Sequence, residues 1–269
     1  MTQKPTLCPR CGTLIGSEES HCSQCGASRS ALLWRVLGLA RGADGDQIIK
    51  GIITLNVVYY VISLALNVRT GSGGFYAPGD LSLLFLGATG TVPIDQFGNF
   101  WTLLSANYLH GGILHLLFNL MALHRIGPLA VNEYGSKRMF IIYTVGGVFG
   151  FLVSYLAGVP FTIGASAAIC ALIGALLYFG KTRGGVYGGS VYREVSGWVV
   201  GLLVFGLIVP GINNWGHGGG IVGGIALGML LGYGERRRET ALHTNLALLC
   251  GVATVSVLVW RVALAVLSF

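Results

Sequence analysis

The chain has 269 residues, 53% of them hydrophobic and only 10% charged, and its mean hydropathy is +0.71. This composition excludes an ordinary water-soluble domain and is typical of a membrane protein. The formal net charge of +7 is assigned to basic residues at the cytosolic face of the membrane, which argues against nucleic-acid binding.

The amino-terminal segment is polar and contains two Cys-x-x-Cys-Gly motifs. Cys8 and Cys11 belong to the first motif, and Cys22 and Cys25 belong to the second. Four thiolates in such paired motifs are typical of a tetrahedral structural zinc site. We therefore predict a zinc ribbon over residues 1–28, with disulfides as the alternative chemistry. A zinc ribbon can bind a protein partner, but these residues do not identify one.

Seven apolar stretches follow, each long enough to cross a bilayer as a helix of about 20 residues. They lie near 48–67, 111–130, 138–158, 163–180, 195–212, 217–233 and 243–265. The sequence therefore predicts an all-α polytopic membrane protein with a six-helix core at 48–234, followed at 235–269 by a basic loop and a seventh transmembrane helix. Residues 29–47 have the pattern of an amphipathic linker along the inner membrane surface.

Basic residues predict the orientation of these spans. Lys and Arg precede span one and follow spans two, four and six, whereas the alternate connections carry almost none. Because basic loops stay in the cytosol, we expect a cytosolic amino terminus and an external carboxyl terminus, in a bacterial cytoplasmic membrane. No charge-flanked apolar core opens the chain, so we expect no cleaved signal peptide. Arg261, near the outer end of span seven, is expected to reach outward.

The first external loop, residues 68–109, is too long for a simple connection. Its apolar pieces LSLLFLG and FWTLLSANYL are too short to cross the membrane. We expect these pieces to lie in the membrane interface beside the bundle. An external loop with a little buried surface is the alternative.

Spans four and six each carry one polar residue near the outer end. Ser166 stands in the first turn of span four, and His217 stands in the first turn of span six. A histidine inside a membrane is costly and indicates function, whereas a lone serine is more often a packing residue. Glycines recur at every fourth position in span six: Gly220, Gly224, Gly228 and Gly232. If span four packs on this stripe, the serine and the histidine come within hydrogen-bonding reach.

Span two adds His115 and Asn119, which share one helical face, and His110 about a turn higher at the outer rim. A serine becomes a nucleophile when a histidine takes its proton. The oxyanion formed by attack on a carbonyl then needs preorganised donors, such as an imidazole, an amide and the N–H of the nucleophile. No acidic residue stands near this depth, so the pattern predicts a Ser-His dyad with an oxyanion hole.

Three motifs occur in order on spans two, four and six: HGGILHLLFN, GASA and HGGGIVGGIALG. Together they resemble the rhomboid family of intramembrane serine proteases, over residues 51–233. The resemblance implies a catalytic pair, Ser166 and His217. It also implies a set of residues that bind the oxyanion or the substrate: His110, His115, Asn119 and Gly164. Such an enzyme cuts single-span membrane proteins within the lipid bilayer, near the outer face, and needs no catalytic cofactor.

Three positions depart from the family's pattern. Ala167 stands where the family usually has glycine, and Cys170 stands where an aromatic residue commonly stacks on the catalytic histidine. Thr102 follows Trp101, where many members have arginine. These departures leave open an inactive rhomboid-like protein that binds membrane clients without cutting them.

A second alternative treats the three histidines as ligands of a metal ion or haem in a transporter or redox protein. This alternative gives Ser166 and Asn119 no role. A serine-directed activity probe separates the three hypotheses, because only a protease is labelled at Ser166.

Overall fold

The computed structural model describes residues 6–8, 13–16, 19, 21–26, 44–236 and 238–267. The chain divides into two compact units, Met1–Asp44 and Gly45–Phe269. The predicted amphipathic linker at 29–47 lies outside the described residues as far as position 43.

The described part of the amino-terminal unit contains a small hairpin. Strand β1 (Thr6–Leu7) pairs antiparallel with strand β2 (Leu14–Ile15). The N–H of Cys8, directly after β1, donates to the carbonyl of Thr13 at 2.7 Å. This bond fixes the backbone at the first predicted zinc ligand. The side chains of Cys8 and Cys22 are both buried.

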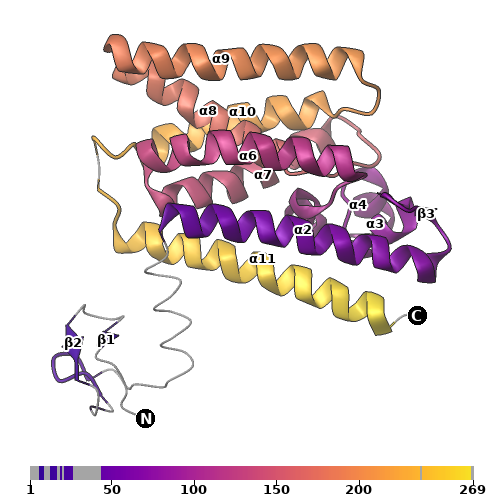
Figure 1. Ribbon diagram of the computed structural model, residues 1–269, viewed down its shortest axis with the longest axis horizontal. Coiled ribbons are helices and arrows are strands. Elements are labelled where there is room, and N and C mark those ends of the chain that lie inside the picture. The colour runs from indigo at the N-terminus through magenta and orange to yellow at the C-terminus, as the bar shows by residue number, and fades with distance from the viewer. Residues whose placement is uncertain are drawn as a thin grey trace. The chain divides into compact units, whose positions relative to one another are not determined.

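The second unit is a bundle of helices (Figure 1). Its long helices are α2 (Gly45–Thr70), α6 (Ile113–Tyr134), α7 (Ser136–Leu156), α8 (Ser166–Arg183), α9 (Gly185–Ile208), α10 (Asn214–Leu231) and α11 (Ala241–Leu267). Among the described residues, α2, α6, α7, α9 and α11 are long and apolar enough to cross a membrane, by length and composition. The predicted all-α, multi-pass membrane fold is confirmed.

Helices α8 and α10 are shorter, at 18 residues each, and do not belong to those five. In this view they lie between α9 at one edge and α2 and α11 at the other (Figure 1). Helix α8 contacts α6, α7, α9 and α10. Most of α8 is buried, and the glycine face of α10 packs on α8 and α7, so polar and glycine residues are tolerated there. The middle of the bundle is therefore where a polar site can be built.

The first loop is more ordered than the sequence predicts. It contains a hairpin of β3 (Gly73–Gly74) and β4 (Ala77–Pro78), three short helices and one turn of 3-10 helix. The helices are α3 (Asp80–Leu86), α4 (Thr91–Phe97) and α5 (Thr102–Ser105), followed by η1 (Ala106–Tyr108). The two apolar pieces form α3 and α5 with η1, whereas α4 was not predicted. Its Pro93 lies in the first helical turn, where proline is tolerated.

Helix α9 begins at Gly185, ten residues before the predicted start of span five. The prediction was wrong because Arg193 and Glu194 lower the hydropathy without ending the helix. An apolar window identifies the part of a helix that lies in hydrocarbon and does not mark where the helix begins.

The end of the bundle at which α7 begins is closed by a residue from far along the chain. Helix α7 begins at Ser136, and the Glu239 carboxylate accepts hydrogen bonds from the N–H groups of Lys137, at 2.7 Å, and Arg138, at 3.0 Å. The buried Arg138 side chain donates to the carbonyl of Gly232 at 2.7 Å. A carboxylate at a helix N-terminus satisfies N–H groups that have no partner within the helix.

Candidate active site

Helices α8 and α10 bring the predicted serine and histidine together. Ser166 is the first residue of α8, and His217 lies in the first turn of α10. Nε2 of His217 is 2.9 Å from Oγ of Ser166. The two residues that the sequence singled out in different spans therefore share a hydrogen bond.

The glycine stripe of α10 allows this approach. A Cβ at Gly220 would lie 3.0 Å from Cβ of Cys170, and one at Gly224 would lie 2.6 Å from the carbonyl carbon of Ala171. Both neighbours belong to α8. Any side chain at these positions would force the helices apart. The partner of the stripe is therefore α8, as required for Ser166 and His217 to meet.

The turn before Ser166 requires a glycine. Gly164 has φ +127, and a Cβ there would lie 2.7 Å from Nε2 of His115. Other residues rarely adopt this backbone conformation. The N–H of Gly164 donates to the carbonyl of Ala106 at 2.9 Å. Because Ser166 begins the helix, its own N–H has no partner in the preceding turn and lies at the positive end of the helix dipole.

The backbone just before α6 orients the side chain of His115. Its Nδ1 accepts a hydrogen bond from the N–H of Gly111 at 3.3 Å. In the neutral ring the proton then sits on Nε2, which can donate toward the turn that carries Ser166. Asn119 is nearly buried, and its amide donates to the carbonyl of His115 at 2.8 Å. That amide has a second N–H available for another acceptor.

His110 lies beside His115. Its side chain is fully buried, and the two ring centroids are 5.0 Å apart in an edge-on arrangement. The sequence placed His110 one turn higher on span two, but α6 begins only at Ile113. Helical periodicity therefore does not apply to it. Burial, and then the nearby His115, lowers the pKa of His110, so that this ring is neutral behind the site.

A cavity of about 1230 Å³ contains four of the predicted site residues: Ser166, His217, His115 and Asn119. Its walls are mostly apolar and include Phe118 of α6 and Phe205 of α9, whose ring centroids are 6.1 Å apart. An apolar cavity with a few convergent polar groups is typical of a substrate site. These two helices form its sides.

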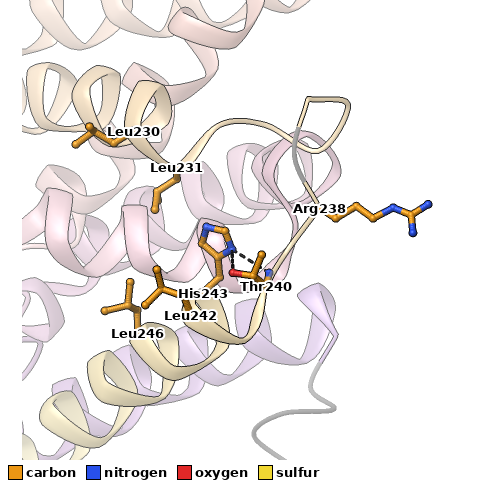
Figure 2. A pocket seen from close by; sticks show the side chains of 7 residues that line it. All are labelled: Leu230, Leu231, Arg238, Thr240, Leu242, His243 and Leu246. Carbon is orange, nitrogen blue, oxygen red and sulfur yellow. Dashed lines mark hydrogen bonds between the residues drawn. The ribbon is translucent and has the colours of Figure 1, made fainter. Parts of the chain in front are cut away.

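A second, smaller cavity of about 540 Å³ lies near the junction of α10 and α11. Figure 2 shows that leucines form its wall and that Arg238 points away from them. The imidazole of His243 accepts a hydrogen bond from the N–H of Thr240 at 3.0 Å. No serine lines this cavity, although Oγ1 of Thr240 also lies 3.1 Å from Nδ1 of His243.

Asn213 is a site residue that sequence reasoning missed. It caps α10, because its Oδ1 accepts from the N–H of Gly216 at 2.9 Å. Its Nδ2 donates to Ser154 Oγ at 2.6 Å and to Thr162 Oγ1 at 2.9 Å. Asn213 thus joins the start of α10 to the segment that leads to Ser166. An asparagine directly before a helix is a recognised capping signal that could have identified it.

Two of the departures, Ala167 and Cys170, lie in α8. The Ala167 methyl lies next to Gly150, where an added Cβ would be 3.1 Å from it, so this glycine leaves room for the methyl. Cys170 is fully buried beside α10. Nδ1 of His217 is buried, and no hydrogen bond to it is formed within the described part of the chain. The second nitrogen of the imidazole therefore has no orienting partner there.

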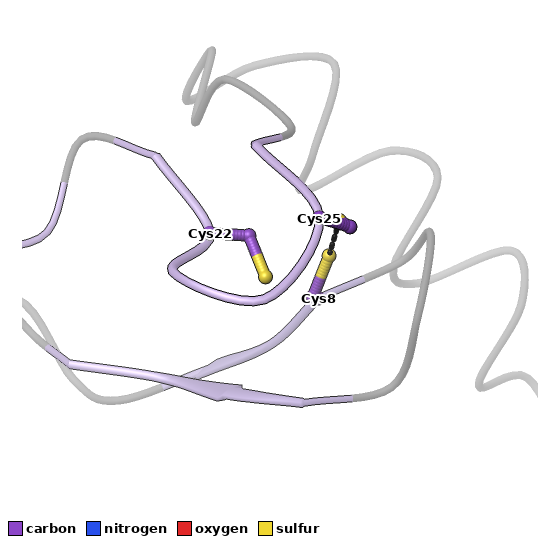
Figure 3. Close-up of side chains that lie close together, drawn as sticks. All are labelled: Cys8, Cys22 and Cys25. Atoms are coloured by element: carbon purple, nitrogen blue, oxygen red, sulfur yellow. Dashed lines mark hydrogen bonds between the residues drawn. The ribbon is translucent and has the colours of Figure 1, made fainter.

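The cysteines form a separate cluster (Figure 3). The Sγ atoms of Cys8, Cys22 and Cys25 all lie within 4.8 Å of one another, and those of Cys8 and Cys25 are 3.5 Å apart. Four sulfurs at about 2.3 Å from a zinc ion are separated by about 3.8 Å in a tetrahedron. The three thiols fit such a site, and the fourth predicted ligand, Cys11, lies outside the described residues. Within the described chain this is the only such group of three, so the three histidines do not converge on a metal position.

Known proteins that resemble this chain are rhomboid proteins. The family model described as Rhomboid domain matches residues 98–234. Rhomboid protease GluP of Bacillus subtilis is 34% identical over 172 residues, which cover 62% of this chain and 34% of that protein. RHOMBOID-like protein 4 of Arabidopsis thaliana is 32% identical over 167 residues, which cover 61% and 41%. RHOMBOID-like protein 5 of the same plant is 34% identical over 140 residues, which cover 50% and 45%. The chain spans less than half the length of each of these relatives.

Proposed function

Because the chain belongs to the rhomboid family, we propose that it is an intramembrane serine endopeptidase in which Ser166 and His217 form the catalytic dyad. The observation that carries this proposal is the 2.9 Å contact between Oγ of Ser166 and Nε2 of His217. The contact lies in the large apolar cavity, beside donors that can bind an oxyanion. The name of the relative GluP, a rhomboid protease, supports the same activity.

In the proposed reaction, Oγ of Ser166 attacks the carbonyl carbon of a peptide bond while Nε2 of His217 takes the hydroxyl proton. The carbonyl π electrons move to oxygen, and the oxyanion is bound by three donors: the N–H of Ser166, Nε2–H of His115 and the free N–H of Asn119. When the C–N bond breaks, His217 returns its proton to the leaving amine. Water then attacks the acyl ester with His217 again as base, and releases Ser166.

The proposed substrates are single-span membrane proteins, whose helix would reach the dyad through the cavity between α6 and α9. We place the site near the outer face of a bacterial cytoplasmic membrane, with the amino terminus in the cytosol and the carboxyl terminus outside. The support is the distribution of Lys and Arg, which alternates between connections. Water from the outer phase could then reach the acyl ester.

We also propose that the chain consists of four segments with different roles. Residues 1–28 form a structural zinc ribbon, 29–47 a linker, 48–234 the catalytic core, and 235–269 a basic loop with the seventh span. Cys8, Cys11, Cys22 and Cys25 would hold the zinc ion, and thiolate coordination would stabilise the ribbon's fold. The ribbon supplies no residue to the dyad.

One observation favours a second candidate, a rhomboid-like protein that binds membrane clients without cutting them. Nδ1 of His217 has no hydrogen bond within the described chain, and Cys170 does not supply an aromatic ring. A histidine without an orienting partner is a weaker base, because both its tautomer and its ring angle are less fixed.

A fluorophosphonate probe tests the proposal. We expect the purified full-length protein to be labelled at Ser166 and to cut a model transmembrane substrate, whereas Ser166→Ala and His217→Ala should do neither while remaining folded. The double variant should be hardly worse than either single variant, because dyad members act as a unit. Cleavage by folded Ser166→Ala at the original rate would refute the dyad. A wild type that neither labels nor cuts, yet binds the substrate helix, would establish the second candidate.

A further inference from the structure

Arg261 of α11 binds the end of the short helix α3. Its Nε donates to the carbonyl of Phe85 at 2.9 Å, and its Nη2 donates to the same oxygen. Its guanidinium carbon lies 4.7 Å from the ring centroid of Trp101 and 5.3 Å from that of Trp260. The sequence led us to expect that Arg261 reaches outward. Its side chain binds the first loop, because a carbonyl at a helix end needs a donor and two aromatic faces attract a cation.

Side chains of three other helices bind carbonyl groups at the end of α3. Its last carbonyl groups have no partner in the helix, and each binds a side chain from a different helix: Phe85 binds Arg261 of α11, Leu86 binds Tyr59 of α2 at 2.8 Å, and Gly87 binds Ser105 of α5 at 2.8 Å. The ring of Trp101 also closes on this turn, since a Cβ at Gly87 would lie 2.5 Å from it. The position of the chain directly after α3 is therefore set by other helices.

The chain directly after α3 is hydrogen-bonded through its backbone to the segment that precedes Ser166. The N–H of Thr89 donates to the carbonyl of Thr162 at 3.1 Å, and the N–H of Thr162 donates back to Thr89 at 2.7 Å. Thr162 precedes Gly164 and the turn that presents Ser166. Its hydroxyl also accepts from Asn213, the cap of α10. The starts of both dyad helices therefore depend on one residue, which is paired with the segment that α3 positions.

We propose that Arg261 is a positioning residue for the reaction. By fixing the carbonyl of Phe85 it holds Thr89 against Thr162, and so fixes the turn that carries Ser166. The inference rests on the proposed function and gives a role to α11, which contributes no side chain to the large cavity. A planar guanidinium suits the site, because it can stack on Trp101 while two of its N–H groups bind one oxygen.

The test compares Arg261→Met and Arg261→Lys in the full-length protein. The matched control is Arg69→Met, because Arg69 also links α11 to the bundle, but its side chain binds the carbonyl of Val266 at 3.1 Å and not that of Phe85. The measurements are the rate of fluorophosphonate labelling at Ser166, and kcat and KM for a transmembrane substrate. A small displacement of reacting groups can cost about 100-fold in rate.

We expect Arg261→Met to lower the labelling rate and kcat by about 10- to 100-fold, with KM and the melting temperature little changed. Arg261→Lys should recover part of the rate, because an ammonium keeps one donor and a cation over Trp101, and Arg69→Met should behave as wild type. Wild-type labelling by folded Arg261→Met would overturn the inference, as would an equal loss in Arg69→Met. Should Arg261→Met fail to fold, Arg261→Lys carries the test, and a labelling rate equal to that of wild type would overturn the inference.

Hydrogen exchange separates this inference from the proposed function. If wild type is not labelled, the protease proposal fails, but the contact chain from α11 can still be measured. Arg261→Lys should then speed the exchange of the Thr89 and Thr162 amides, whereas Arg69→Met should not. Unchanged exchange at both amides would show that Arg261 does not hold the bridge.

Discussion

Gly224 of α10 lies directly against Ala171 of α8, so closely that a Cβ on Gly224 would be 2.6 Å from the carbonyl carbon of Ala171. This contact sets the distance between the two helices that carry Ser166 and His217. The distance between Ser166 and His217 therefore depends on Gly224, which has no side chain and lies two helical turns from His217.

The first prediction concerns this contact. Gly224→Ala should force α10 away from α8, destabilise the protein by about 1–3 kcal/mol, and slow labelling of Ser166. Gly218→Ala is the matched control, because a Cβ at Gly218 of the same helix meets nothing within 4 Å. Thermal unfolding and probe labelling in detergent check both variants. Equal behaviour of the two would mean that the close approach does not set the dyad distance.

The second prediction concerns the oxyanion donors. His115→Ala should lower kcat about 100- to 1,000-fold, because it removes an Nε2–H that Gly111 holds in place. Asn119→Ala should leave slow but measurable cleavage, since the other donors remain. Single-turnover kinetics with a transmembrane substrate distinguish these outcomes from a loss of binding. A His115→Ala enzyme with unchanged kcat would remove His115 from the oxyanion hole.

The third prediction concerns Asn213. Asn213→Ala removes the cap of α10 and the bonds to Ser154 and Thr162, so it should cost about 1 kcal/mol or more of stability and also lower the labelling rate. The neighbouring Asn214→Ala loses only a bond to the Gly206 carbonyl of α9. If the neighbouring variant lost as much labelling, the cap would have no special part in the site.

The fourth prediction concerns zinc. The purified protein should contain one zinc ion, and Cys8→Ser with Cys22→Ser should abolish it while cleavage persists, because the ribbon gives nothing to the dyad. Cys250→Ser, a thiol outside the cluster, should keep the metal. Elemental analysis and the cleavage assay suffice. Loss of activity together with the zinc would show that the ribbon supports the core.

The fifth prediction concerns topology. Arg236→Cys should react with a membrane-impermeant reagent only after the cells are permeabilised. Leu267→Cys should already react in intact cells. The expected sides follow from the basic connections, which favour the cytosol. Labelling of both positions in intact cells would contradict the proposed orientation of α11.

Regular features of the sequence predicted much of the fold and of the candidate site. Each apolar stretch corresponds to a helix, and the four-residue spacing of Gly220 and Gly224 indicated a helix contact that forms with α8. Ser166 and His217 could be paired because each stands at a fixed depth near the start of its own helix. Helical periodicity carries such information reliably.

Irregular segments did not follow from the sequence. The partners of Arg261 and Thr162 are backbone groups of the first loop, and which carbonyl group faces which side chain depends on turns that have no period. Helical periodicity also does not place the His110 side chain, since this residue precedes α6 and does not belong to it. The start of α9 was missed because its first residues are helical without being apolar.

The cap of α7 has a consequence for how the chain is made. Glu239, whose carboxylate binds the N–H of Lys137, follows that residue by 102 positions. The ribosome therefore completes α8, α9 and α10 before the acceptor for the first turn of α7 exists. Until then these N–H groups must find water or lipid headgroups at the membrane surface. The end of the bundle at which α7 begins closes last, although α7 is among the earlier helices to be inserted.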